Sequence, residues 1–166
     1  MFARIIREGF VAGLIGAVAV AAWFFLVDLI GGNAFYTPSM LGSAVFWGLR
    51  DPAEVVVNFP TVIAYSMLHA VLFILVGMIA AAFATMVDKF PSTLFLIIVF
   101  FAIFEVGFYI VVATMAAPLL GRLAWSNVAV GNLIAALGMG YYLWTVHPRI
   151  REQLMEHPLG ESIDGE

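Results

Sequence analysis

The chain has 166 residues, of which 64% are hydrophobic and only 11% are charged, and its mean hydropathy is +1.07. A soluble domain carries roughly 25% charged residues, so this composition indicates a membrane-embedded protein and leaves no room for a soluble catalytic domain. The formal net charge of -4 without a basic patch excludes nucleic-acid binding, and the lack of cysteine excludes disulfides, thiolate metal sites, iron–sulfur clusters and c-type haem attachment.

Four apolar segments are long enough to cross a bilayer. Each reaches the ~20 residues that a helix needs for about 30 Å of hydrocarbon. The segments cover residues 9–31, 61–87, 92–117 and 124–146. The sequence therefore predicts an all-α fold, an integral membrane four-helix bundle within residues 1–148, followed by an acidic cytoplasmic tail over 149–166.

The only substantial loop outside these segments covers residues 33–59. Its stretch 38–47 is too short to span a membrane and contains Phe46 and Trp47, so we expect a short interfacial helix between the first two spans. A lid or docking surface over an outward-facing pocket is the alternative interpretation.

Basic residues set the expected orientation. Five of them fall on one side of an even-numbered set of helices and two on the other: Arg4, Arg7, Lys89, Arg149 and Arg151 against Arg50 and Arg122. Because basic residues are enriched in cytoplasmic loops, both termini are predicted to be cytoplasmic, in a bacterial inner membrane.

Each predicted span carries one strongly polar residue, and these residues descend toward the bilayer centre. At 1.5 Å per residue, Glu105 lies at about the midplane, Asn132 about 4 Å outward, His69 about 7 Å and Asp28 about 12 Å. Ser66 lies one turn from His69 and Tyr109 one turn from Glu105, which adds hydroxyls to the set. We therefore predict an intramembrane polar cluster of Asp28, Ser66, His69, Glu105, Tyr109 and Asn132.

Three hypotheses account for this cluster. The first is a structural clamp in which His69 bonds Glu105 and Asn132 bonds across helices. The second is a proton or ion pathway, since chains of carboxyl and imidazole groups mark such paths. The third is a metal or cofactor site with His69 and Glu105 as candidate ligands, although the Glu-x-x-His pairs of helical di-iron bundles are missing. His147 and His157 adjoin prolines near the tail and are expected to be solvated.

Function is not fixed by any motif. Nucleophile elbows, phosphate loops and zinc-protease signatures are absent, so an enzyme is not favoured and no cofactor is required. The prediction is a small accessory or structural subunit of a larger membrane complex, plausibly respiratory or photosynthetic, that contacts lipid and other subunits. The alternative is a self-contained bundle that conducts protons or binds a small ligand or metal through the polar cluster.

Five aromatic residues are predicted to form the interface with other subunits: Trp47, Phe100, Phe101, Phe104 and Phe108.

Overall fold

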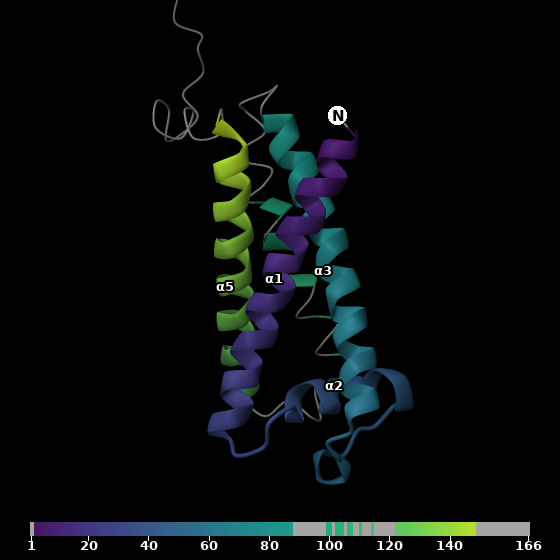
Figure 1. Cartoon of the computed structure of the whole chain (residues 1–166). Coiled ribbons are helices and arrows are strands. Elements are labelled where there is room, and N and C mark those ends of the chain that lie inside the picture. Colours follow the sequence, from purple (N-terminus) through teal and green to yellow (C-terminus); the bar gives the residue numbers. More distant parts are fainter. Residues whose placement is uncertain are drawn as a thin grey trace, which may run out of the picture.

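The computed structural model describes residues 2–87, 99–100, 102–104, 106–107, 110, 114 and 122–148, and no strand occurs among them. The elements with bounds in these ranges are α1 (Phe2–Ile30), α2 (Tyr36–Trp47), the 3-10 helix η1 (Pro52–Glu54), α3 (Phe59–Val87) and α5 (Arg122–Val146) (Figure 1). The predicted all-α fold is therefore confirmed. Within the described ranges, three helices are long and apolar enough to cross a membrane, α1, α3 and α5, which identifies the chain as a membrane protein.

The observed helices extend beyond the apolar segments that predicted them. α3 and α5 each begin two residues before the predicted spans, whereas α1 begins at Phe2, seven residues before the predicted start at residue 9. Arg4 and Glu8 form an ion pair one helical turn apart, 2.7 Å between Nε and Oε1, which supports this polar first part of α1. The predicted span 92–117 and the tail 149–166 lie mostly or wholly outside the described residues.

Glycines bring α1 and α3 into backbone contact. A Cβ atom added to Gly77 would collide with the carbonyl oxygen of Gly9 and the amide nitrogen of Gly13, and one added to Gly13 would collide with the backbone of Ile74. Small residues four apart allow this close approach in lipid, where apolar side chains gain little by leaving the hydrocarbon. The main core lies along this contact and between α1 and α5, and includes Ala12, Ala17, Val20, Phe73, Ala81, Ala135 and Met139.

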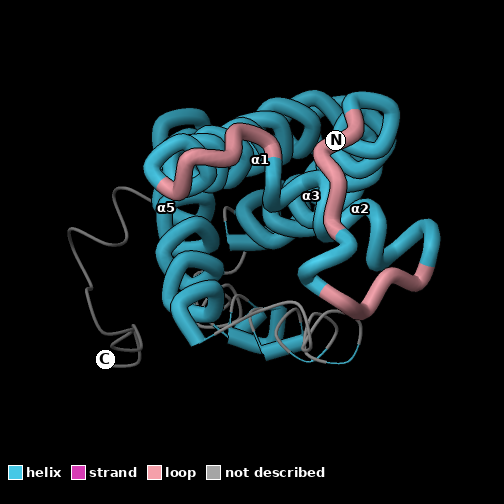
Figure 2. The backbone as a smooth tube through the Cα atoms, turned by 90° about the horizontal axis from the view of Figure 1, so that it is seen from below, coloured by secondary structure: helices cyan, strands magenta, loops and turns pink. Residues whose placement is uncertain are grey.

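The two ends of the described bundle differ. The start of α1 and the end of α5 lie at the same end, where Arg4 Nη2 donates a hydrogen bond of 3.0 Å to the carbonyl oxygen of Val146 (Figure 1). α2 lies at the opposite end, and Figure 2 shows this end from below.

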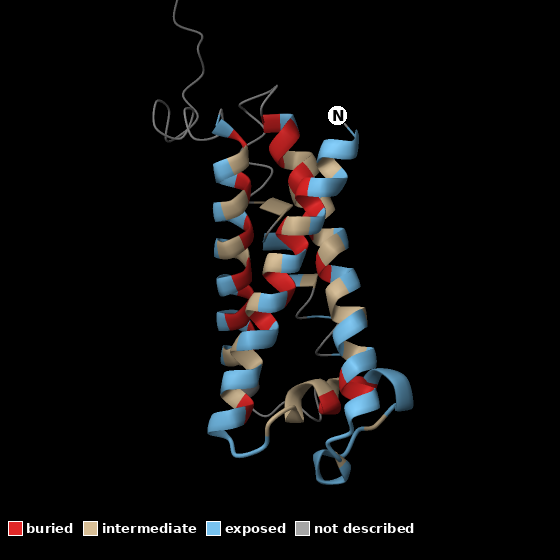
Figure 3. Ribbon diagram, in the orientation of Figure 1, coloured by how far each residue is buried: buried red, intermediate tan, exposed pale blue. Residues whose placement is uncertain are grey.

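Buried residues face between the helices and exposed residues face outward (Figure 3). The outward faces are apolar, with Leu75, Leu133 and Leu137 exposed, so these faces contact lipid in a membrane.

Candidate functional site

A cavity of about 480 Å³ lies among α1, α2, α3 and α5. It runs along α1 from Leu14 to Asp28 and along α3 from Val62 to Phe73, and these stretches correspond to about 21 Å and 17 Å of helix. The cavity is therefore elongated. α1 and α3 separate toward α2, beyond their close contact near the N-terminus (Figure 1), and the lining residues of both helices continue in that direction.

One flank of the cavity is open and apolar. Leu14, Val18 and Phe25 line the cavity, yet they are 45%, 59% and 38% exposed at the molecular surface. All three belong to α1, one of the helices apolar enough to span the membrane. These three apolar side chains therefore border both the cavity and the outer face of a helix that can span the membrane.

Several polar side chains line the cavity. The His69 Nε2 atom lies 3.3 Å from the carbonyl oxygen of Ala17, and the ring stacks against Tyr65 and tilts against Phe73. Ser66 lines the cavity one turn from His69, and Asn132 reaches it from α5. Three residues of the predicted cluster therefore line one cavity: Ser66 and His69 from α3, and Asn132 from α5.

Asp28 lines the same cavity but has a different local role. Its Oδ2 accepts a hydrogen bond of 2.8 Å from the Thr37 amide, and its Oδ1 accepts one of 2.6 Å from the Thr37 hydroxyl. The carboxylate is buried, and it satisfies an amide in the first turn of α2 that has no partner within the helix. Asp28 therefore links the C-terminal part of α1 to the first turn of α2.

Asp28 and His69 do not contact each other. His69 bonds Ala17, and Asp28 lies eleven residues further along α1, which corresponds to about 16 Å. The two groups are separate polar positions at different depths of one cavity. A proton could move between them only through intervening groups or water.

Other predicted residues fall elsewhere. Glu105, Tyr109, Phe101 and Phe108 lie outside the described residues, so the proposed bond from His69 to Glu105 stays a prediction. The remaining interface candidates are described: Phe100 packs against Phe83 and Phe104, with ring centroids 5.2 Å and 6.4 Å apart, and Trp47 is 76% exposed.

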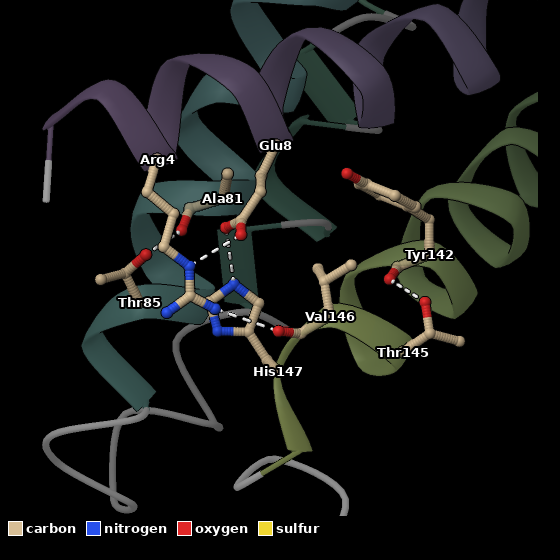
Figure 4. Close-up of polar contacts among 8 residues, drawn as sticks. All are labelled: Arg4, Glu8, Ala81, Thr85, Tyr142, Thr145, Val146 and His147. Atoms are coloured by element: carbon tan, nitrogen blue, oxygen red, sulfur yellow. Dashed lines mark hydrogen bonds and ion pairs between the residues drawn. The ribbon is translucent and has the colours of Figure 1, made fainter.

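A second polar site at the other end of the bundle escaped the sequence analysis. Glu8 of α1 points toward His147, which follows α5, with 3.1 Å between Oε2 and Nε2, and the same carboxylate pairs with Arg4 (Figure 4). The expectation that His147 is solvated is wrong, because its side chain is completely buried. We call Arg4, Glu8 and His147 the end cluster. The signal for it was the placement of a carboxylate just before the first apolar span and an imidazole just after the last.

The described residues include no group of three or more His, Cys, Asp or Glu side chains that could hold a metal ion. The end cluster supplies one imidazole and one carboxylate, and the cavity supplies His69 and Asp28 at separate depths. Comparisons of the chain with protein families, with curated proteins and with solved structures find no match.

Proposed function

We propose that this membrane protein holds one lipid-soluble small molecule in the cavity between its helices. The observation that carries this proposal is the combination of an apolar side opening with polar groups inside. Small-molecule sites are concave, mostly apolar, between about 300 and 1,000 Å³ in volume, and equipped with a few polar groups that orient the ligand. The cavity of about 480 Å³ matches each of these properties.

The ligand hypothesis fits the polar groups better than a proton pathway. A pathway needs groups that can exchange protons in sequence, but both Asp28 oxygens already accept bonds from Thr37. The distance along α1 between Asp28 and the bonded partner of His69, about 16 Å, is too long for direct transfer. A ligand needs only one orienting group, with an apolar space for the rest of its body.

The arrangement in the membrane extends this proposal. We propose a four-helix bundle in a bacterial inner membrane, with both termini cytoplasmic and α2 at the outer interface. The end of α3 and the start of α5 lie at opposite ends of the bundle, which supports a further crossing between them (Figure 1). The pairing of Arg4 with Val146 supports termini on one side.

Membership of a larger complex is a second candidate function. Trp47 and Phe46 of α2 and Val56 of the following loop are 76%, 40% and 73% exposed, so apolar side chains extend from the end that carries α2. Such residues suit either the lipid headgroup region or a neighbouring subunit. A ligand-holding chain of 18.1 kDa can serve as a subunit of a respiratory or photosynthetic complex, so the two functions are compatible.

Photolabelling with an alkyl diazirine tests ligand binding. The reagent dissolves in the bilayer and inserts into neighbouring side chains when illuminated. With the protein reconstituted in nanodiscs, we expect saturable labelling of the α3 peptide around residues 66–73. The variant Ala21→Trp should remove this labelling, because Ala21 lines the cavity and an indole there fills part of it.

Ala129→Trp is the matched control. Ala129 is also an exposed alanine of a spanning helix, but it does not line the cavity. This variant should be labelled like the wild type. Labelling that never saturates, or that Ala21→Trp and Ala129→Trp reduce equally, would contradict the proposal, because lipid-facing surface alone would then explain it.

A further inference from the structure

The cavity lining restricts the charge of its ligand; this inference rests on the proposed function. None of the described lining residues is lysine or arginine. An anionic headgroup would therefore lie in an apolar space without a counter-ion and in the same cavity as the Asp28 carboxylate, which is strongly unfavourable. The Asp28 oxygens are already occupied by Thr37, so a cation would have to compete with two short hydrogen bonds. The lining favours a neutral ligand.

The hydrogen bond of His69 indicates which polar group the ligand carries. A backbone carbonyl oxygen can only accept, so the contact with Ala17 requires that His69 Nε2 carries the hydrogen. In the neutral ring, Nδ1 then has a free lone pair and acts as an acceptor. Within the described part of the chain, no donor to Nδ1 is found. An imidazole that lines the cavity thus offers an acceptor to a ligand that donates.

We propose that the ligand is a neutral lipid with a hydroxyl group, an alcohol or a phenol on a long hydrocarbon body. The hydroxyl donates a hydrogen bond to His69 Nδ1, with Ser66 and Tyr65 hydroxyls lining the same region. The hydrocarbon body occupies the apolar remainder of the cavity, where Phe24, Phe25 and Phe35 supply aromatic faces. The apolar side opening admits such a molecule from the bilayer.

A series of ligands that share one alkyl chain length and differ only in the terminal group tests which polar group the cavity prefers. Dodecane, 1-dodecanol, dodecanoate and dodecylamine compete with the alkyl diazirine in nanodiscs, at concentrations expressed as mole fractions of the bilayer. We expect 1-dodecanol to compete about 3- to 10-fold better than dodecane, which is the effect of one net hydrogen bond. Dodecanoate and dodecylamine should compete more weakly than the alcohol.

Variants of His69 connect this preference to the imidazole. His69→Phe keeps an aromatic ring between Tyr65 and Phe73 but removes the acceptor, so dodecane should still compete and the advantage of 1-dodecanol should disappear. His69→Gln retains an acceptor oxygen and should keep part of the advantage. Retained competition by dodecane in both variants establishes that the cavity is intact.

The outcomes separate this inference from the proposed function. If dodecane and 1-dodecanol compete equally with the wild type, or if an ionic ligand competes best, the hydroxyl assignment is wrong although the cavity binds ligands. If His69→Phe keeps the full advantage of the alcohol, the assignment to His69 is wrong. If none of the four compounds reduces labelling, ligand binding by the cavity is itself contradicted.

Discussion

Replacing Gly77 by leucine is expected to separate α1 from α3 and to prevent the native fold. The added Cβ would overlap the Gly9 carbonyl oxygen and the Gly13 backbone, and neither can rotate away as a side chain could. Overpacking a core costs about 1 to 3 kcal/mol when side chains can adjust, so a collision with backbone should cost about 3 kcal/mol or more. Thermal unfolding in detergent and the monodispersity of the purified variant report this loss.

Gly140→Leu is the matched control. Gly140 lies in a spanning helix, α5, but an added Cβ there meets nothing within 4 Å. This variant should unfold within a few degrees of the wild type, with a small gain from the higher helix propensity of leucine. If Gly77→Leu were as stable as Gly140→Leu, the close contact of α1 with α3 would be wrong, and so would the position of the cavity beyond it.

Loss of the Glu8 carboxylate from the end cluster is also expected to destabilise the fold strongly. Glu8→Ala removes the carboxylate that pairs with the completely buried His147 side chain and with Arg4. Removing one partner of a buried pair costs about 3 to 5 kcal/mol, because the other polar group stays away from water. We expect a loss of about 3 kcal/mol in the free energy of unfolding, and easier proteolysis where α5 ends. Glu8→Gln should lose less, since its amide oxygen still accepts a hydrogen bond.

A double-mutant cycle with His147→Phe assigns this loss to the pair. If Glu8 stabilises the fold through His147, the two substitutions together should cost clearly less than the sum of their separate costs. Glu54→Ala serves as a control, because Glu54 is an exposed carboxylate in the 3-10 helix. Additive costs for Glu8 and His147 would mean that their contact contributes nothing to stability.

The sequence predicted the three described spanning helices, α1, α3 and α5, because membrane helices follow from hydropathy and length. The sequence predicted the ends of these helices, and the contacts between those ends, poorly. The polar start of α1 was left out of the first span because hydropathy measures partition into lipid, whereas a helix continues wherever local pairs such as Arg4 and Glu8 support it. The burial of His147 depends on which helix ends meet in space, and the sequence alone does not contain that information.

The sequence indicated several of the polar residues that line the cavity, but it did not indicate the cavity itself. Asp28, His69 and Asn132 were recognised because polar groups in apolar spans are rare. Small residues recur at positions 9, 13, 17 and 21 on one face of α1, yet Gly9 and Gly13 pack against α3 whereas Ala21 is exposed and lines the cavity. Periodicity identifies a helix face, and it does not tell where two helices diverge. The contact of Asp28 with α2 was not predicted, because the expected short helix began at residue 38, whereas α2 begins at Tyr36 and includes Thr37.

Native mass spectrometry of the gently extracted protein shows directly whether the cavity holds a ligand. We expect an 18.1 kDa chain, alone or with partner subunits, that carries one small neutral molecule and releases it on collisional activation. The same adduct should remain on Ala129→Trp and be missing from Ala21→Trp. If the wild-type and Ala21→Trp proteins carry identical adducts, or if neither carries a defined adduct, the cavity does not hold a ligand.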